Sequence, residues 1–544
     1  MSRKPIGQLL KEKGYVSEAH IKFALKEQQA TGERLGEVLS RLGLVTDFEV
    51  AKVLAEQSGY PFLDLRNVKP EPRALMKVPP NLARENEVLP FRLKGLVLHV
   101  AVADPYNTRI FDLLTRVSHC QLKIYVASRS EIKRTIEWYY YFLQKPPEEE
   151  INRVVERLKR NPAAEINVEE LLNNILIYAI SLRATDVHLT PSEKSCRVYY
   201  RLDGLLELYF VFPAALHPRL IGAIKVRAGM DIAEQRRPQD GRMRFEFLGE
   251  EYDFRISTVR ATHGENMVIR ILPVQATVLH LSSLGFEERE IKQLELLFTK
   301  PYGMIIVTGP TGSGKTTTLY SALRLIDVIS KNVLTAEDPV EYSFPLIRQT
   351  QINEEIGYTF AAAIRHFLRQ DPDVILVGEI RDEETATMAV RAALTGHLFL
   401  STLHTNDAIS AVERLRDLGV KDNLLAGSLL GVTAQRLLRR ICPHCKEEYK
   451  PPEELLRRYQ LPKRTYFRGK GCSMCRGTGY AGRFAVTEIF YVSPEVRELI
   501  AQGAPYTEIL KVARKEGFVS LLEAAKRKVL AGETTIEEMA RVIG

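Results

Sequence analysis

The stretch Gly309-Pro310-Thr311-Gly312-Ser313-Gly314-Lys315-Thr316-Thr317 decides the fold of the central part of this chain. It follows the apolar run Met304-Ile305-Ile306-Val307 and precedes a helix-like segment, Leu319–Ile326. A strand, a glycine-rich loop and a helix in this order form the context that a phosphate-binding P-loop requires. The sequence therefore predicts an α/β domain that binds a nucleoside triphosphate, with the nine loop residues around its phosphates.

The loop residues have separate tasks in this prediction. The glycines allow backbone N–H groups to turn inward around a polyphosphate, and the N-terminus of the following helix adds a positive dipole end. Lys315 is expected to reach the β- and γ-phosphates, and Thr316 is expected to hold Mg²⁺.

Carboxylate and imidazole groups follow three further predicted strands. Glu341 comes shortly after the apolar segment Val333–Thr335, Glu379 ends a second apolar run, and His404 ends a third. Ligands of open parallel sheets bind at the carboxyl ends of the strands. We therefore expect the three side chains to converge beside the P-loop, although each alone is compatible with a surface charge or a hydrogen-bonded histidine.

Glu379 has the position of a Walker B carboxylate, which holds Mg²⁺ directly or through water. An aspartate is more usual at this place, and here Gly378 separates the glutamate from its strand.

Four arginines are candidates for stabilising the charge that develops on the γ-phosphate oxygens. Arg365 and Arg369 are four residues apart in Phe360–Gln370, so we expect them on one helix face. Arg255 and Arg270 fall on predicted strands of a preceding domain. Surface salt bridges are the open alternative for each of them.

Four of the six cysteines form two closely spaced pairs, Cys442 with Cys445 and Cys472 with Cys475. Paired CxxC motifs in an intracellular protein are typical of a tetrahedral Cys₄ zinc site. The gap between the pairs is longer than usual, and Pro451–Leu461 is predicted to fill it as a small helical insert. An empty or redox-active pair is the alternative.

Composition limits the class of protein. The chain has 544 residues, 45% of them hydrophobic and 26% charged, which is typical of a globular protein with several domains. No apolar run approaches the ~18–20 residues of a membrane span, and no signal-peptide core follows the first residues. We therefore expect a cytoplasmic protein. Its net charge of +8 only weakly suggests nucleic acid or anionic membrane as a partner.

An internal repeat occupies residues 5–57. Its marker residues recur after 29 positions, and they are Gly7, Gly14 and Gln28 in the first copy and Gly36, Gly43 and Gln57 in the second. The apolar spacing predicts a short helix, a glycine turn and a second helix in each copy.

The remaining segments complete a multidomain α/β organisation. The predicted parts are an N-terminal domain at 1–142, a linker at 143–165, a second α/β domain at 166–276, the P-loop domain at 277–440, the cysteine module at 441–488 and a helical region at 489–544.

The chain resembles the secretion ATPases that power type IV pilus assembly and type II secretion. Residues 337–341 are similar to their Asp box, 371–382 to their Walker B region and 395–407 to their His box. Residues 184–188 and 238–242 resemble signatures of their second N-terminal domain. The four cysteines followed by 477–483 mark the assembly and secretion branch, since pilus-retraction ATPases generally lack this module.

This resemblance implies a RecA-like hexamer with ATP between the second N-terminal domain and the P-loop domain. Glu341 would then be the general base that positions water, Glu379 the Walker B carboxylate, and His397 and His404 members of the His box. Arg255, Arg270, Arg365 and Arg369 match the arginines that contact the phosphates. Domain closure on ATP would push on an integral platform protein of the inner membrane.

The repeat at 5–57 resembles a cyclic di-GMP-binding domain with two 24-residue motifs that begin RLG. The second copy begins Arg34-Leu35-Gly36, whereas the first begins Pro5-Ile6-Gly7 and lacks the arginine expected to meet the ligand. A purely structural repeat that docks a partner therefore stays open.

Pilus assembly is the favoured function, and type II secretion shares every motif named above. A nucleic-acid translocase is a more distant alternative, because no lysine and arginine cluster with interleaved aromatic residues forms an obvious strand-binding surface.

Overall fold

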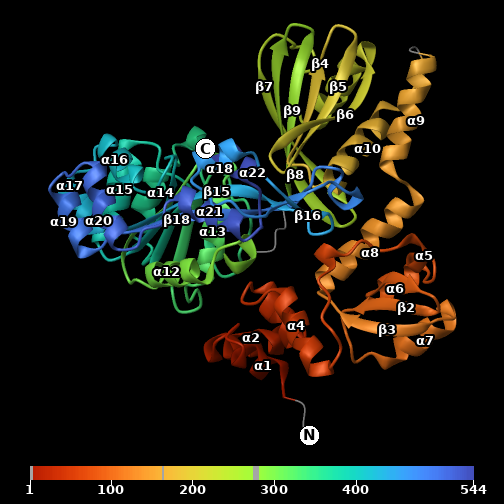
Figure 1. Ribbon diagram of the computed structural model, residues 1–544, viewed down its shortest axis with the longest axis horizontal. Coiled ribbons are helices and arrows are strands. Elements are labelled where there is room, and N and C mark those ends of the chain that lie inside the picture. Colours follow the sequence, from red (N-terminus) through yellow and green to blue (C-terminus); the bar gives the residue numbers. More distant parts are fainter. Residues whose placement is uncertain (1–3, 162–163, 274–280) are drawn as a thin grey trace. The chain divides into compact units, whose positions relative to one another are not determined.

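The computed structural model describes residues 4–161, 164–273 and 281–544. The chain forms two compact units, Met1–Ala276 and Thr277–Gly544, so the boundary predicted after residue 276 falls between the units but outside the described residues (Figure 1). No helix among the described residues has the length and apolar character needed to cross a membrane.

The first unit begins with two successive helix pairs, as the glycine spacing predicts. The helices are α1 Ile6–Glu12, α2 Glu18–Thr31, α3 Leu35–Arg41 and α4 Asp47–Ser58. Gly14 and Gly43 connect the helices of each pair at φ values of 75° and 72°, in the left-handed region that favours glycine. Ser17 and Thr46 then cap α2 and α4 with their hydroxyl groups.

A small α/β layer follows the repeat. Its three-stranded sheet has the order β1-β2-β3, and the strands are β1 Val88–Lys94, β2 Val97–Val102 and β3 Gln121–Val126. The accompanying helices are α5 Pro72–Leu75, α6 Pro80–Asn86, α7 Thr108–Ser118 and α8 Arg129–Gln144.

The structure differs from the predicted linker at 143–165, because most of this segment is helix α9, Pro147–Arg160. Pro147 is the first helical residue, three glutamates fill the first turn and three basic residues fill the last. Proline and acidic residues at a helix start, with basic residues at its end, stabilise a helix through its dipole. The same residues that suggested a charged linker are therefore helix signals.

A six-stranded antiparallel sheet with the order β6-β5-β4-β9-β8-β7 completes the first unit. Its strands are β4 Asp186–Pro191, β5 Ser195–Leu202, β6 Leu205–Pro213, β7 Gln239–Phe247, β8 Glu250–Ala261 and β9 Gly264–Pro273. Alternate residues pack into a core with α10 Val168–Ser181 and α11 His217–Arg227. The opposite face carries charged residues on the central strands and exposed apolar side chains of β6, namely Leu206, Leu208 and Val211.

The second unit is built on a seven-stranded sheet with the order β12-β11-β13-β14-β10-β15-β18. All of its strand pairs are parallel except β15 with β18. The strands are β10 Gly303–Thr308, β11 Val333–Glu337, β12 Arg348–Gln351, β13 Val374–Val377, β14 Leu398–Leu403, β15 Leu429–Ile441 and β18 Tyr480–Tyr491.

Helices cover both faces of this sheet. Met304 and Ile306 of β10 belong to one apolar core, whereas Ile305 and Val307 belong to the other. The first core holds α14 Phe360–Phe367, α15 Glu383–Leu394, α16 Ser410–Asp417 and α17 Asp422–Ser428, and the second holds α12 Glu288–Phe298 and α13 Lys315–Leu323. A parallel sheet covered on both faces explains why its strands are continuous apolar runs in the sequence.

The C-terminal part packs on the end of β15 and β18. It contains the antiparallel pair β16 Lys446–Tyr449 and β17 Tyr466–Gly469, the insert helix α18 Glu453–Arg458, and the helices α19 Pro494–Ala501, α20 Tyr506–Lys515, α21 Leu521–Leu530 and α22 Ile536–Ile543. The helical insert predicted within 451–461 is confirmed by α18.

A buried ion cluster attaches the last helix to β15. The carboxylate of Glu538, fully buried, accepts hydrogen bonds from the guanidinium groups of Arg439 at 2.7 Å and Arg541 at 2.6 Å. Burial acts to raise the pKa of Glu538, but the hydrogen bonds from the two arginines prevail and lower it to about 2. The carboxylate is therefore charged at neutral pH.

We expect Glu538→Gln to loosen α22 from β15. Removing one partner of a buried ion pair costs about 3–5 kcal/mol, because the remaining charge stays buried without compensation. Backbone amides of Ile536–Ile543 should then exchange hydrogen at least about a hundredfold faster at neutral pH. Glu453→Gln is the control, since Glu453 lies at the surface, and unchanged exchange in the Glu538 variant would contradict the anchoring role.

Candidate functional site

The predicted P-loop connects the carboxyl end of β10 to the start of α13. Gly309, Gly312 and Gly314 have φ values of 146°, 77° and 86°. A Cβ atom on Gly309 would lie 2.6 Å from the backbone oxygen of Gln435, and one on Gly314 would lie 2.8 Å from its side-chain nitrogen. Only glycine fits these two positions without moving β15.

The P-loop presents polar groups to which a ligand could hydrogen-bond. No side chain caps the N-terminus of α13, whose first residue is Lys315. The Lys315 ammonium group donates to the carbonyl oxygens of Gly309 at 2.9 Å and Pro310 at 3.2 Å. The Ser313 hydroxyl is buried and has no hydrogen-bond partner within the described ranges. A buried unpaired hydroxyl beside an uncapped helix end fits a bound polyphosphate.

Two further predicted residues lie beside this loop. Glu379 follows β13 and its carboxylate accepts a hydrogen bond from Arg381 at 2.5 Å. The imidazole of His404, just after β14, lies 3.3 Å from the other carboxylate oxygen of Glu379. Lys315 and Glu379 influence each other's ionisation, which places the P-loop and both strand ends at one edge of the sheet.

Burial and neighbouring charges shift the pKa values of Glu379 and Lys315 at this edge of the sheet. Burial acts to raise the pKa of Glu379, but the hydrogen bond from Arg381 and the nearby charges of Arg381, His404 and Lys315 outweigh it and lower the pKa. Burial lowers the pKa of Lys315, and the carboxylate of Glu379 opposes that change. Oxygen ligands such as the Glu379 carboxylate and the Thr316 hydroxyl are the type that Mg²⁺ prefers.

Two glutamates, one at the end of β11 and one in the loop that follows it, have different surroundings. Glu337, the last residue of β11, is buried and accepts hydrogen bonds from Tyr320, from the Thr335 hydroxyl at 2.6 Å and from Gln349 at 3.1 Å. Glu341 lies four residues later, half-buried in the connection between β11 and β12. The carboxylate of Glu337 is therefore occupied within the fold, whereas Glu341 is in a loop near the carboxyl end of β11.

Of the two arginines predicted to share a helix face within 360–370, only one lies on a helix. Arg365 lies on α14, but the helix ends at Phe367, so Arg369 lies beyond it and not on the same helix face. The two remain close, because the guanidinium of Arg369 donates to the backbone oxygen of Arg365 at 2.8 Å. Arg365 also forms an ion pair with Glu384 of α15 at 2.6 Å.

The structure does not bring His397 to the P-loop. His397 directly precedes β14, whereas His404 directly follows it, so the two histidines lie at opposite edges of the sheet. The His397 imidazole hydrogen-bonds the backbone oxygen of Ala392 at 3.0 Å and the Thr395 hydroxyl at 3.1 Å. The resemblance places both histidines in one His box, but β14 separates them in the fold.

Arg255 and Arg270 belong to a row of charged residues across the six-stranded sheet. Directly paired positions on neighbouring strands, from β5 to β7, are Arg201, Asp186, Arg270, Arg255 and Arg242. Residues paired in this way project from the same face of a sheet. Asp186 is buried and lies 3.2 Å from Arg270 and 3.5 Å from Arg201, so it holds two of the arginines in the row.

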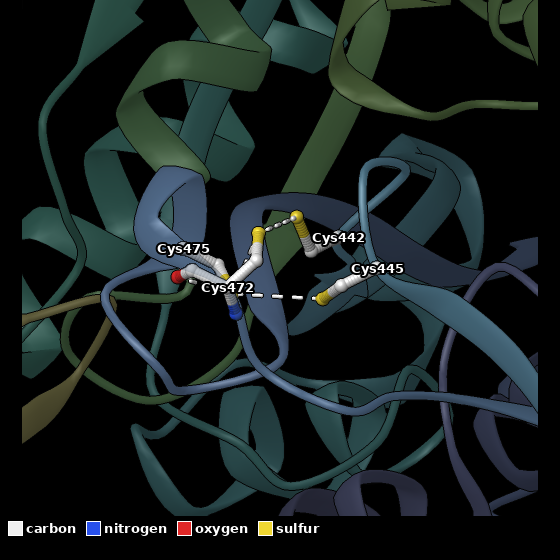
Figure 2. Close-up of side chains that lie close together, drawn as sticks. All are labelled: Cys442, Cys445, Cys472 and Cys475. Atoms are coloured by element: carbon white, nitrogen blue, oxygen red, sulfur yellow. Dashed lines mark hydrogen bonds between the residues drawn. The ribbon is translucent and has the colours of Figure 1, made fainter.

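The four paired cysteines form one cluster, as predicted. Figure 2 shows Cys442 opposite Cys472 and Cys445 opposite Cys475, with sulfur–sulfur distances of 3.9 Å and 3.7 Å. All four sulfur atoms lie within 4.8 Å of one another. Tetrahedral zinc with Zn–S bonds of about 2.3 Å separates its sulfur ligands by about 3.8 Å, so this donor set fits zinc.

Two equivalent hydrogen bonds connect the copies of the N-terminal repeat. The side-chain amide of Gln28 donates to the backbone oxygen of Glu33 at 2.8 Å, and that of Gln57 donates to Lys4 at 2.6 Å. Each glutamine ends one motif and contacts the residue that precedes the first position of the other motif. The two copies are therefore related by equivalent contacts as well as by sequence.

The first positions of the two motifs differ in side chain but not in backbone. Arg34 has φ −71° and ψ 144°, and Pro5 has φ −57° and ψ 145°. Arg34 is exposed and pairs with Asp104 at 2.9 Å. The backbone at residue 5 thus accommodates an arginine, and the asymmetry of the repeat is one of side-chain chemistry.

Sequence reasoning missed several polar residues at the P-loop edge. Glu337 lies within a recognised motif, but the sequence does not indicate that its side chain is buried and hydrogen-bonded, and it does not identify Arg381 as the partner of Glu379. Gln435 contacts Ser313 although 122 positions separate them along the chain. No local pattern around Gln435 indicates this contact, because it arises from the pairing of β10 with β15.

Two family models match the chain. A model described as "Type II/IV secretion system protein" matches residues 162–541, and one described as "MshEN domain" matches residues 58–144. The second match begins immediately after the repeat at 5–57.

Several curated proteins are similar over much of the chain. The type IV pilus assembly ATPase PilB of Myxococcus xanthus is 39% identical over 557 residues, or 98% of each chain. PilB of Thermus thermophilus is 39% identical over 538 residues, which are 95% of this chain but 60% of that protein, so the chain spans less than two thirds of that relative. The type II secretion system protein HxcR of Pseudomonas aeruginosa is 47% identical over 375 residues, 69% of this chain and 77% of that protein.

A solved structure has the same fold over the matched region. The ATPase DotB of Legionella pneumophila aligns with a TM-score of 0.52 at 22% identity, covering 68% of this chain and 94% of that one.

We expect the purified chain to carry one zinc ion and Cys472→Ser to lose it, because three thiolates do not complete the tetrahedral ligand set. Elemental mass spectrometry of the protein after gel filtration measures the ratio. Cys120→Ser is the matched control, since Cys120 is a buried cysteine that is not a member of the four-cysteine cluster. Equal zinc content in wild type and Cys472→Ser would rule out the proposed ligand set.

Proposed function

The chain belongs to the Type II/IV secretion system protein family, and on that premise we propose that it is a motor ATPase that drives type IV pilus assembly. The observation that carries this proposal is the convergence of the P-loop, Glu379 and His404 at the carboxyl ends of β10, β13 and β14. The pilus-assembly relatives align with this chain over nearly its whole length at 39% identity, slightly above the 37% of a type II secretion system protein E that aligns equally fully.

The P-loop would bind the phosphates of ATP. The backbone N–H groups of the P-loop and the uncapped start of α13 favour a negatively charged ligand. The Lys315 ammonium group, which donates to carbonyl oxygens of the loop, would donate to a phosphate oxygen when ATP is bound. Thr316 and Glu379 would hold Mg²⁺, which would neutralise charge on the β- and γ-phosphates. Arg381 and His404 keep the Glu379 carboxylate in position for this task.

Glu341 is the residue we assign as general base. The resemblance to the secretion ATPases assigns this role to Glu341, and a general base of this kind takes a proton from the attacking water. The oxygens of Glu337 are occupied by Tyr320, Thr335 and Gln349, so this buried glutamate is a poor candidate. Glu341 follows the same strand in a less buried loop, which supports its assignment.

The mechanical step would come from closure of the first unit on the nucleotide. Arg255 and Arg270 of the sheet row, together with Arg365 and Arg369, would stabilise charge on the γ-phosphate. Hydrolysis would remove the group that these arginines hold, and the units would separate. We place this cycle in a homo-hexamer that acts, from the cytoplasmic side, on a platform protein of the inner membrane.

We expect Lys315→Ala to abolish ATP hydrolysis and Glu341→Gln to retain ATP binding while losing at least about a hundredfold of turnover. Steady-state ATPase assays and calorimetric ATP titrations measure the two properties separately. Glu355→Gln, at an exposed glutamate in the short helical turn after β12, should behave as wild type. Light scattering should give a particle of six times 61.8 kDa, and near-normal turnover in Glu341→Gln would sink the assignment of the base.

Type II secretion is the second candidate, and the higher identity to HxcR over the ATPase region favours it. The two processes are distinguished in cells that lack the gene. Loss of surface pili with normal protein export supports pilus assembly, whereas normal pili with failed export supports secretion.

For the N-terminal region we propose cyclic di-GMP as a regulatory ligand of the 5–57 repeat. The symmetric glutamine contacts, the exposed Arg34 and the adjoining MshEN match support this proposal. An anionic ligand would replace Asp104 as the partner of Arg34.

We expect Arg34→Ala to weaken cyclic di-GMP binding at least about tenfold, because it removes a charge-assisted hydrogen bond. Pro5→Arg should tighten binding, since the backbone at residue 5 already has the conformation of residue 34. Calorimetric titration of the full chain measures both, with Arg73→Ala as the control at another exposed arginine of the first unit. Absence of heat at high micromolar ligand in all variants would leave the repeat a structural element only.

A further inference from the structure

Gln435 lies on β15 directly behind the P-loop, and its side chain is almost completely buried, with 1% of the residue exposed. Its amide nitrogen donates to the backbone oxygen of Ser313 at 2.6 Å. Its amide oxygen accepts a hydrogen bond from the Thr318 hydroxyl at 2.7 Å. The side-chain amide therefore hydrogen-bonds the P-loop through its nitrogen and the start of α13 through its oxygen.

These two contacts enclose the junction between loop and helix. Ser313 lies just before Gly314, and Thr318 lies in the turn that follows Lys315, so one amide group bridges the segment that orients the lysine. The side-chain nitrogen of Gln435 also fills the space where a Cβ atom on Gly314 would lie. The left-handed turn at Gly314 and the position of Gln435 are thus matched to each other.

The neighbouring residue extends the contact to a second loop of the site. The guanidinium of Arg436 donates to the backbone oxygen of Gln435 at 3.0 Å and to that of Asn406 at 2.8 Å. Asn406 follows His404, so β15 supports both the P-loop and the loop after β14. Gln435 is the member of this arrangement that touches the phosphate-binding segment through its side chain.

We propose that Gln435 is a positioning residue that holds the P-loop in its phosphate-binding shape without touching the nucleotide. The inference rests on the ATPase function proposed above. The amide of Gln435 supplies a donor for the Ser313 carbonyl and an acceptor for the Thr318 hydroxyl from one side chain. A carboxylate would face the Ser313 carbonyl with an acceptor and add negative charge beneath the phosphates.

The test compares Gln435→Met with Thr433→Val. Methionine retains length and apolar volume but forms neither hydrogen bond. Thr433 is on the same strand two residues earlier, is fully buried, and its hydroxyl has no partner within the described residues, which makes Thr433→Val a matched loss of a polar group. Calorimetric titration with ADP and with a non-hydrolysable ATP analogue, and the nucleotide-induced rise in melting temperature, are the readouts.

We expect Gln435→Met to weaken binding of both nucleotides about 10- to 100-fold and to lose most of the nucleotide-induced thermal stabilisation, because the P-loop would lose the two hydrogen bonds that fix its shape. The melting temperature without nucleotide and the zinc content should stay close to those of Thr433→Val. Gln435→Glu should bind still more weakly, and Thr318→Val, which removes one of the two hydrogen bonds, should have an intermediate defect.

Wild-type affinity in Gln435→Met would overturn the inference. If that variant does not fold, wild-type affinity in Thr318→Val overturns it, and an intermediate defect there supports it. These results are distinct from a failure of the ATPase proposal, in which the wild-type chain itself would bind neither nucleotide.

Discussion

The parallel register of β10 with β14 and β15 is the constraint on which the second unit depends. Thr308 of β10 pairs with Leu403 on one side and Ala434 on the other, so the next residues are Gly309, His404 and Gln435. Slippage along these buried strands is unfavourable, because a shift of one residue would move each apolar side chain from one closely packed core to the other. The phosphate-binding loop and its supports are therefore set by strand pairing.

Strand β15 connects the parts that surround this loop. Gln435 contacts the P-loop, Arg439 holds the last helix through Glu538, and Cys442 directly follows the strand as the first member of the cysteine cluster. The zinc module and the C-terminal helix are thus attached to the same rigid element that lies behind the P-loop. The cysteine module is therefore connected to the P-loop through β15 without contributing a residue to it.

The first unit arranges its charges in a different way. Its antiparallel sheet aligns four arginines and one aspartate in a row, because residues paired across strands share a face. Asp186 restrains two of these arginines, Arg201 and Arg270. In the repeat, by contrast, the first residues of the two copies, Arg34 and Pro5, have similar backbone conformations. Only the second copy therefore carries a charged side chain at this position.

The sequence by itself determined the local features: the P-loop, the strand ends with Glu379 and His404, the paired cysteines and the 29-residue repeat. Each depends on residue types at short spacing, where glycine geometry and strand or helix periodicity act directly. Only the tertiary structure separated His397 from His404, distinguished the buried Glu337 from Glu341, turned the expected linker into α9 and brought Gln435 to Ser313. Those outcomes depend on strand pairing and burial between distant segments, and no short pattern in the chain encodes these contacts.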